Sequence, residues 1–230
     1  MKHIVFIIGS LRKDSFNRQL AMVAESLLKD RFVISYLDFE NIPYFNQDLE
    51  SSIVNSQQST DNSQCSKSAP ESKSSFHRSE DGELEAGCRC FADSPVEAYG
   101  RMSLSIIRQQ ILDCDGIWVF TPEYNRSYPG LLKNLFDWLS RPMDISNPTN
   151  ATAVQGKKIT VSGAGGNNKT ASCREKLNEL LRFIKMDVMT EPQTGIALGK
   201  EAWTNGEFKL TDEQLSELKM QAERFAEFVQ

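Results

Sequence analysis

The sequence contains no apolar run long enough to cross a membrane and no cluster of basic residues. Its 230 residues carry 26 Lys and Arg against 31 Asp and Glu, a net charge of −5. A mildly acidic chain without a basic run is poorly suited to a phosphate backbone, so nucleic acid is not an expected partner. A transmembrane helix needs roughly 20 apolar residues, so no membrane partner is expected either. The apolar run at residues 4–8 is short and precedes polar residues 9–17, so we expect a first strand there and not a signal peptide.

Cysteine is also scarce, and its count of five is odd. Cys114 and Cys173 fall within expected helices, which favours a reducing, cytoplasmic setting over a disulfide framework. Cys88 and Cys90 stand close together, but zinc normally takes four ligands. Only one further cysteine and one histidine lie nearby in that irregular stretch. We therefore predict no metal site.

Apolar runs alternate with helix-like periods along most of the chain, which predicts an α/β fold with right-handed crossovers. Five strands fit the doubly wound, flavodoxin-like order 2-1-3-4-5, a parallel sheet with helices on both faces. The order itself rests on the motifs described below. The expected strands are residues 3–8, 32–37, 116–120, 158–162 and 187–190, and the main expected helices lie at residues 17–29, 96–114, 130–139, 170–184 and 212–229.

The whole chain, residues 1–230, is expected to form one domain with an insertion. Residues 51–94 are rich in Ser, Gln, Asn and Glu, with no visible period. Such a stretch buries too little apolar surface to offset its ordering entropy, so we expect a mobile surface insertion.

Three local patterns predict details of the remaining elements. Met102, Ile106 and Ile111 are expected near one face of their helix. The pair Asn205-Gly206 predicts a hairpin-type turn. Thr211, followed three residues later by a glutamine, predicts a capping box that opens the last helix.

A polar loop follows the first strand and resembles a phosphate cradle. Gly9 permits a tight turn, Ser10, Ser15 and Asn17 are neutral donors, and Arg12 supplies a positive charge. A helix is expected to begin there, so its free N–H groups and dipole favour an anion. The loop has neither a Walker A motif nor a dinucleotide fingerprint. The alternative is a polar turn in which Ser15 only caps the helix.

The loop after the third strand has the composition of a site for a flat ring. Backbone amides from Glu123 to Asn125 can meet the polar edge of a heterocycle, and Tyr124 can pack on its face. Structural roles are open alternatives: Tyr124 as a loop anchor, Asn125 as a turn former and Glu123 as a structural carboxylate.

A third, glycine-rich stretch at residues 162–168 is expected to form a turn between the fourth strand and its helix. Its amides can donate to a ring oxygen beside the helix N-terminus, although an ordinary flexible connection fits the same residues. The three loops follow strands one, three and four, which are neighbours in the order 2-1-3-4-5. They are therefore expected to form one site at the carboxyl edge of the sheet.

Together these loops resemble the NAD(P)H-dependent FMN reductase family, which has a flavodoxin-like fold and includes quinone, azo-dye and chromate reductases. The resemblance covers about residues 2–50 and 95–195. The insertion at 51–94 is atypical, and Asn167-Asn168 stands where members often have glycine. The resemblance rests on three motifs: Gly9-Ser10-Leu11-Arg12 with Ser15 and Asn17; Thr121-Pro122-Glu123-Tyr124-Asn125 with Ser127, Pro129-Gly130, Leu132-Lys133-Asn134 and Asp137-Trp138; and Ser162-Gly163-Ala164-Gly165-Gly166.

The resemblance implies a non-covalent FMN that takes hydride from NADH or NADPH and reduces a small-molecule acceptor such as a flavin, quinone or azo compound. The flavin carries the chemistry, so no catalytic side chain is required. This agrees with the only two histidines, His3 in an expected buried strand and His77 in the insertion. The residues implied to bind the cofactor are Ser10, Arg12, Ser15, Phe16, Asn17, Pro122, Glu123, Tyr124, Asn125, Ser127, Ser162, Gly163, Ala164 and Gly165.

Two other functions remain open on the residues alone: a flavodoxin-type electron carrier without NAD(P)H turnover, and a phosphate-ligand module without redox work. The resemblance also implies a homodimer or a homotetramer with the flavin near the subunit boundary. In such a dimer, Arg126 and Tyr128 are expected beside the flavin mouth. Tyr128, Leu131, Leu132 and Trp138 make the helix after the second loop apolar on more than one face, so a second cover is expected. Either a partner subunit or another part of the same chain can supply it.

Overall fold

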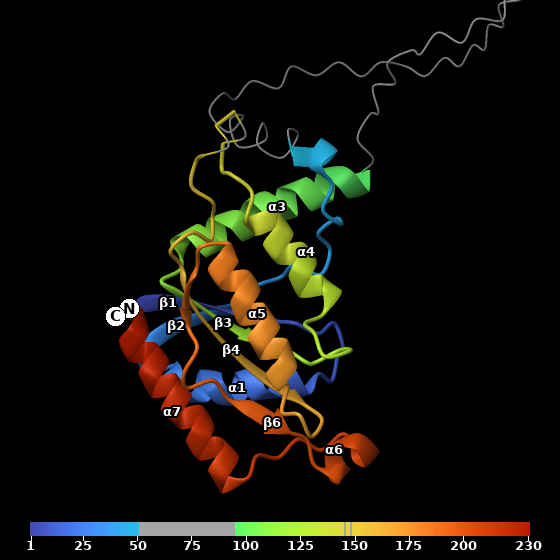
Figure 1. Cartoon of the computed structure of the whole chain (residues 1–230), viewed down its shortest axis with the longest axis vertical. Coiled ribbons are helices and arrows are strands. Elements are labelled where there is room, and N and C mark those ends of the chain that lie inside the picture. Colours follow the sequence, from blue (N-terminus) through green and yellow to red (C-terminus); the bar gives the residue numbers. More distant parts are fainter. Residues whose placement is uncertain (51–94, 145, 148) are drawn as a thin grey trace, which may run out of the picture.

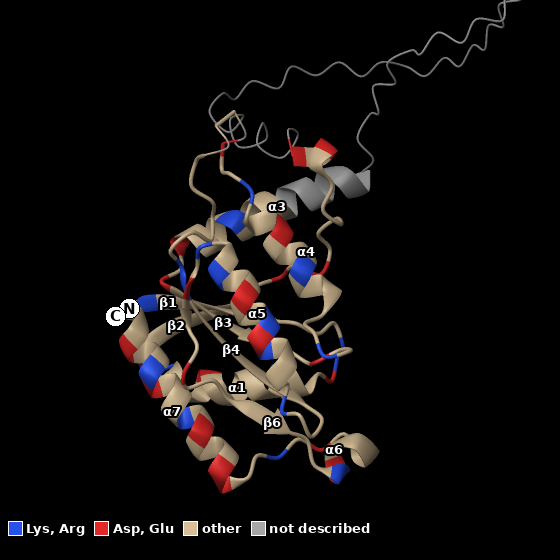
Figure 2. Ribbon diagram, in the orientation of Figure 1, with Lys and Arg blue, Asp and Glu red and all other residues tan. Residues whose placement is uncertain are grey.

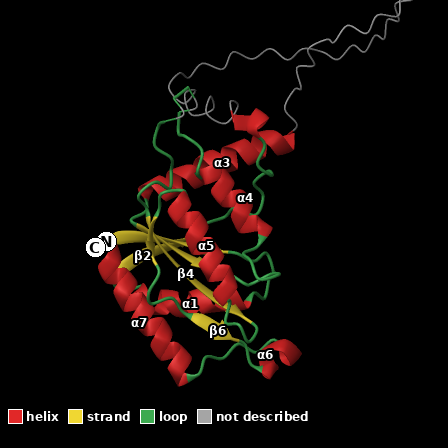
Figure 3. Ribbon diagram, in the orientation of Figure 1, coloured by secondary structure: helices red, strands yellow, loops and turns green. Residues whose placement is uncertain are grey.

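The computed structural model describes residues 1–50, 95–144, 146–147 and 149–230, with the side chains of residues 95–103 left out. The insertion predicted at residues 51–94 lies outside the described residues. At the centre of the fold is a parallel sheet with helices on both faces (Figures 1 and 3). No helix among the described residues is both long and apolar enough to cross a membrane.

The sheet has the order β2-β1-β3-β4-β5, which confirms the predicted flavodoxin-like arrangement, and a sixth strand pairs with β4. All pairings are parallel. The central strands are almost wholly buried, as expected for a sheet covered on both faces. The strands are β1 (Lys2–Ile8), β2 (Phe32–Tyr36), β3 (Gly116–Phe120), β4 (Lys158–Gly165), β5 (Asp187–Met189) and β6 (Gly195–Ala197).

Each face of the sheet has its own hydrophobic core. Alternate residues of β1 and β3 point to opposite faces, so Ile7 and Val119 join one core while Phe6 and Trp118 join the other. Helices α3 (Pro95–Asp113), α4 (Gly130–Leu139) and α5 (Ala171–Phe183) cover the first face, and α1 (Phe16–Leu28) and α7 (Asp212–Val229) cover the second (Figure 1). The short elements η1 (Gln47–Leu49) and α6 (Lys200–Asn205) complete the described fold. Charged residues of both signs are distributed along α5 and α7 (Figure 2).

Beside β4, the edge of the sheet is split between two short strands. β5 pairs with residues 158–160 of β4, and β6 pairs with residues 163–165. The side chain of Gln221 on α7 fills the gap: its Nε2 donates to the Val161 carbonyl at 3.1 Å, and its Oε1 accepts from the Thr194 N–H at 2.6 Å. Gln221 is fully buried, so its amide provides bonds that a continuous strand would otherwise make.

Two local predictions from the sequence are wrong. Ile106 is 53% exposed, because the buried face of α3 follows the helical spacing Leu104, Ile107 and Ile111. Met102 falls among the side chains left out. Asn205-Gly206 is not a hairpin turn: α6 ends there, with Gly206 in the left-handed conformation that commonly ends helices. The capping box at Thr211 is confirmed.

Part of the second apolar face of α4 is covered within the chain, at Trp138, whereas Tyr128 and Leu131 are only half-buried. Phe45 packs edge-on against Trp138 with ring centroids 4.9 Å apart. Trp138 Nε1 and Asn134 Nδ2 both donate to the Pro43 carbonyl, at 2.8 and 3.0 Å. The loop that precedes η1 therefore supplies the cover.

Candidate functional site

The three predicted loops meet at the carboxyl edge of β1, β3 and β4. The Gly9 N–H donates to the Phe120 carbonyl at 2.8 Å, so the first loop starts against the end of β3. A Cβ on Gly9 would lie 3.0 Å from Thr121 Oγ1 and 2.8 Å from a Leu132 methyl group. Only a glycine fits this approach without displacing its neighbours.

Asn17 joins the first loop to the third. Its Oδ1 accepts from the Ala164 N–H at 2.8 Å, and its Nδ2 donates to the Ala164 carbonyl at 3.1 Å. Asn17 is only 3% exposed, so its side-chain amide aligns the start of α1 with β4. The structure thus gives the Asn17 side chain a positioning role in place of the predicted free donor, while its backbone N–H remains in the first turn of α1.

The start of α1 retains several free donors. Ser15 is the N-cap and accepts from the Arg18 N–H at 3.4 Å, so it caps the helix whether or not it also binds a phosphate. Ser10 Oγ accepts from the Arg12 N–H at 3.4 Å. Within the described residues, neither serine hydroxyl donates a hydrogen bond. The N–H groups of the first helical turn lack intrahelical partners, and no acidic residue lies in that turn.

Arg12 is exposed and lies over the ring of Phe16, with its guanidinium carbon 5.1 Å from the ring centroid. Phe16 is buried between the rings of Trp203 and Phe208, with centroids 6.2 and 6.1 Å away. A cavity of about 490 Å³ opens between the first loop and residues 36–40 at the end of β2. Cations and carboxylates both line it: Arg12, Lys13, Arg18, Asp38 and Glu40.

The second loop forms a tight two-residue turn. Tyr124 and Ser127 exchange backbone hydrogen bonds, both 2.9 Å long. Asn125 and Arg126 between them have φ values of 51° and 57°, and positive φ at both central residues defines a type I′ turn. Asn125 is therefore a turn former, as one alternative proposed. The tip of the turn is exposed, and Tyr124 is 54% exposed.

Glu123 and Pro122 connect this loop to α5. The Glu123 carboxylate accepts from the Cys173 N–H at 3.0 Å and from Asn168 Nδ2 at 3.0 and 3.2 Å. Its side chain is therefore a structural carboxylate, which was the alternative reading. Pro122 is buried, and its carbonyl accepts from Thr121 Oγ1 at 2.9 Å.

The predicted third loop begins later than expected. Residues 162–165 continue β4, because Ser162 pairs with β3 and residues 163–165 pair with β6. The turn to α5 lies at residues 166–170. Ser162 Oγ is buried between two partners: Trp118 Nε1 donates to it at 3.0 Å, and it donates to Gln221 Oε1 at 2.8 Å. The structure therefore directs the Ser162 hydroxyl into the core. Gly163 packs against Thr170 and the Thr121 carbonyl, which leaves no room for a side chain.

Burial changes the ionisation of two groups behind the site. It raises the pKa of the Cys173 thiol to about 11, because an apolar environment disfavours the thiolate. It also lowers the pKa of Arg174. The Cys173 thiol contacts the Thr121 hydroxyl at 3.7 Å and the Pro122 carbonyl at 3.4 Å. Cys173 therefore acts as a neutral packing group under this loop.

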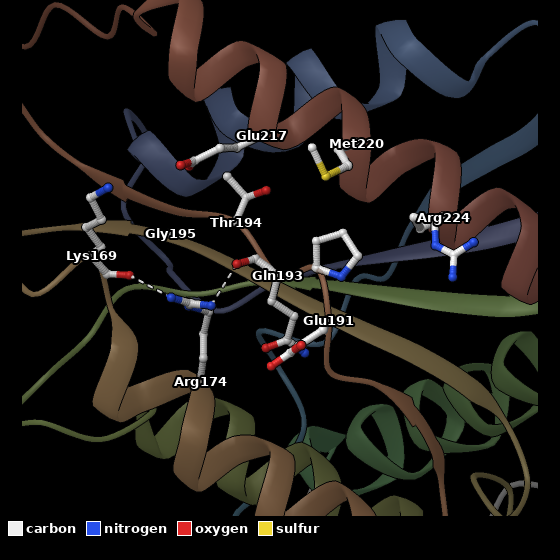
Figure 4. A pocket seen from close by; sticks show the side chains of 10 residues that line it. Lys169, Arg174, Glu191, Gln193, Thr194, Gly195, Glu217, Met220 and Arg224 are labelled. Carbon is white, nitrogen blue, oxygen red and sulfur yellow. Dashed lines mark hydrogen bonds between the residues drawn. The ribbon is translucent and has the colours of Figure 1, made fainter.

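A larger cavity of about 630 Å³ lies behind the third loop, between α5, α7 and the segment that joins β5 to β6 (Figure 4). Arg174 crosses it, with Nη1 donating to the Gln193 carbonyl at 2.9 Å and Nη2 near the Lys169 carbonyl at 3.5 Å. Lys169, Arg174 and Arg224 face Glu191 and Glu217 across this cavity. The nearly balanced charges select neither an anion nor a cation. None of the predicted cofactor-binding residues lines this cavity.

Different parts of the site suit the phosphate and the ring of a flavin mononucleotide: the first loop suits the phosphate, and the second and third loops suit the ring. The first loop offers Ser10, Ser15, Arg12 and the first N–H groups of α1 to one phosphate group. The exposed turn at residues 124–127 and the end of β4 face the same sheet edge. Asn167-Asn168 does not act as a flexible glycine pair, because Asn168 is tied to Glu123. Asn168 was absent from the predicted binding residues, and its departure from the family pattern was the signal that could have identified it.

Comparison with known proteins agrees with this geometry. The model of the NADPH-dependent FMN reductase family matches residues 2–72 and 63–201. A 2-hydroxy-1,4-benzoquinone reductase from a Burkholderia species is 29% identical over 191 residues, which cover 83% of this chain and 75% of that protein. A quinone reductase from Pseudomonas putida is 26% identical over 230 residues, covering 98% and 94% of the two chains.

Solved structures show the same fold at lower identity. The flavoenzyme FerB, an NAD(P)H:(acceptor) oxidoreductase from Paracoccus denitrificans, superposes with a TM-score of 0.68 at 23% identity, covering 100% of this chain and 97% of that chain. An FMN-dependent NADH-azoreductase from Bacillus anthracis, solved with FMN, gives 0.53 at 14% identity, covering 99% of each chain. The family match extends over most of the chain and includes all three loops. The chain therefore belongs to the NADPH-dependent FMN reductase family.

Proposed function

We propose that this protein is an FMN-dependent oxidoreductase that takes hydride from NADPH or NADH and passes electrons to a small-molecule acceptor. One observation carries the proposal: the free N-terminus of α1 and the Tyr124–Ser127 turn lie at the ends of adjacent strands of a flavodoxin-like sheet. An anion-binding helix start beside an exposed turn suits a ligand with one phosphate and one flat ring. The bound flavin supplies the hydride and electron transfer.

The chain's own residues bind and orient the cofactor in this proposal. Ser10, Ser15 and Arg12 hold the phosphate together with the N–H groups of Phe16 and Asn17. Charge-assisted hydrogen bonds from Arg12 add affinity, and the stacking of Arg12 on Phe16 holds its guanidinium beside the helix start.

The ring lies, in the same proposal, against the second and third loops. Backbone N–H groups of Asn125 and its neighbours contact the polar edge of the ring, with Pro122 and Ser127 lining the loop. Tyr124 is exposed enough to cover a ring face. The end of β4, residues 163–165, lies at the opposite side and is held in register by Asn17.

A spectrum of the purified protein tests the proposal. We expect flavin absorbance, FMN and not FAD on chromatography after acid release, and anaerobic bleaching by NADPH or NADH. FMN without bleaching would favour the electron-carrier alternative, and failure to bind any flavin would favour the phosphate-ligand alternative. Stoichiometric FAD would contradict the single-phosphate site.

A quinone is the acceptor class that we propose first, because the similar curated proteins are named quinone reductases. Steady-state oxidation of NADPH with benzoquinone, an azo dye and free FMN as acceptors will rank the three classes. A rate with benzoquinone no higher than with the other two would contradict this choice.

We also propose a cytoplasmic homodimer or homotetramer. The assembly rests mainly on the family resemblance, since the loop before η1 covers Trp138 of α4 within the chain. The location rests on the cysteines, and both described cysteines, Cys114 and Cys173, are buried free thiols. Light scattering on the FMN-loaded protein tests the assembly, and a monomer at micromolar concentration would contradict it.

A further inference from the structure

Two parts of the proposed site are joined by a hydrogen-bonded link between Glu123 and Asn168. Asn168 Nδ2 lies 3.0 Å from Glu123 Oε1 and 3.2 Å from Glu123 Oε2. The same nitrogen lies 3.1 Å from Ser172 Oγ on α5. Glu123 belongs to the loop after β3 and Asn168 to the loop after β4, so this amide spans the two loops and the first turn of α5.

The Glu123 carboxylate serves as the cap of α5. Thr170, at the N-cap position, has a φ of 57° and makes no side-chain capping bond. Glu123 Oε2 instead accepts from the N–H of Cys173, the third residue of α5, at 3.0 Å. A carboxylate at a helix N-terminus satisfies a free donor and complements the helix dipole. The cap thus comes from the loop after β3 and brings that loop against α5.

The link lies directly beside the exposed turn. Tyr124 follows Glu123, and its two backbone bonds to Ser127 close a turn whose central residues both have positive φ. The buried Pro122 precedes Glu123. The turn projects outward from the segment that Pro122 and Glu123 anchor, so the orientation of the turn depends on where the Glu123 carboxylate is held.

We propose that Asn168 is a positioning residue for the flavin site: it holds Glu123 on α5 and thereby fixes the Tyr124–Ser127 turn against the end of β4. The effect on flavin binding rests on the proposed function, whereas the hydrogen-bonded link between Asn168 and Glu123 does not require a cofactor. Its loss frees the turn and weakens the contact between turn and ring, without removing any group that touches the cofactor.

Four proteins test the proposal: the wild type, Asn168→Asp, Asn167→Asp and the double variant Asn168→Asp with Glu123→Gln. Asn168→Asp keeps the size of the side chain but sets a carboxylate against Glu123. Asn167→Asp adds the same charge one residue away, at an exposed side chain that makes no hydrogen bond within the described residues. The double variant exchanges donor and acceptor between positions 123 and 168. The amide nitrogen of the glutamine at position 123 can donate to the carboxylate at position 168, while the amide oxygen of that glutamine still accepts from the Cys173 N–H.

We expect Asn168→Asp to raise the FMN dissociation constant about three- to tenfold, the range for losing a charge-assisted hydrogen bond at a partly exposed site. Hydrogen exchange at the Tyr124 and Ser127 amides should become faster by a similar factor. Asn167→Asp should leave both measurements within about twofold of the wild type, and the double variant should restore most of the loss. If the added negative charge alone caused the changes, Asn168→Asp and Asn167→Asp would change the FMN dissociation constant and the exchange rates by the same factors.

Hydrogen exchange in flavin-free protein separates this inference from the proposed function. If the wild type binds no flavin, the proposed function fails, but faster exchange in Asn168→Asp that the double variant reverses still supports the link. If FMN binds and Asn168→Asp matches Asn167→Asp in both measurements, the positioning role is wrong. A double variant as impaired as Asn168→Asp would overturn it as well.

Discussion

Replacing Gln221 by leucine should destabilise the protein strongly, although the two side chains are similar in size. Gln221 makes four hydrogen bonds in the core, to Thr160, Val161, Ser162 and Thr194. The hydroxyls of Thr160 and Ser162 retain other partners, the Met189 carbonyl and Trp118 Nε1. The Thr194 N–H and the Val161 carbonyl lose the bonds that bridge the gap between β5 and β6.

The magnitude follows from these two groups. Each buried polar group left without a partner costs about 1–3 kcal/mol, so Gln221→Leu should lower the free energy of unfolding by about 2–6 kcal/mol. That is a large share of the roughly 5–15 kcal/mol that stabilises a typical domain. The end of β4 should also lose its register, so FMN affinity should fall with stability.

Urea unfolding of the flavin-free protein, followed by tryptophan fluorescence, measures this loss. Glu223→Leu, an exposed position on the same helix, is the matched control and should change stability by no more than about 0.5 kcal/mol. A loss below about 1 kcal/mol for Gln221→Leu, with an unchanged m-value, would refute the reasoning. It would mean that the core supplies other partners for Thr194 and Val161.

Three further predictions concern the site and its surroundings. Arg12→Ala should weaken FMN binding about tenfold or more, as expected for a lost charge-assisted phosphate contact of roughly 1.5–3 kcal/mol; an unchanged dissociation constant by fluorescence titration would show that Arg12 points elsewhere. Cys173, whose thiol pKa is raised to about 11 by burial, should resist iodoacetamide at pH 7.5 in the folded protein and react after unfolding, as mass spectrometry of the labelled peptide will report; rapid labelling of the native protein would contradict its burial. Deleting residues 51–94 and joining the ends by a short linker should leave a folded, flavin-loaded protein, and loss of soluble expression would show that this segment is structural.

The sheet was predictable because its central strands are short, continuous apolar runs. β3 has the predicted bounds, and the order around it follows from the loops at the strand ends. β6 was not predictable, because a strand of only three residues, Gly195–Ala197, is too short to show a strand period. Its pairing depends on the position of β4 and on Gln221. The error at Ile106 is geometric: Ile106 and Ile111 are five residues apart, which places them about 140° apart around a helix.

The location of the candidate site was predictable, but the use of its side chains was not. Sequence identifies polar residues at strand ends, and Asn17 and Glu123 are both of that type. In the structure their side chains bind the backbone of Ala164 and Cys173. Such hydrogen bonds join residues more than 45 positions apart. Whether a polar side chain binds a ligand or a distant backbone group cannot be read from the residues next to it in the sequence.

The divided edge of the sheet also bears on how the protein avoids aggregation. An uninterrupted edge strand offers a row of unpaired N–H and C=O groups to strands of other molecules. Here β5 and β6 have only three residues each, and a helix side chain, Gln221, occupies the space between them. A strand from another molecule could therefore pair only with β5 or β6, two short and separate segments, and not with one continuous edge strand. The same interruption that shapes the end of β4 therefore disfavours growth of the sheet from one molecule to the next at this edge.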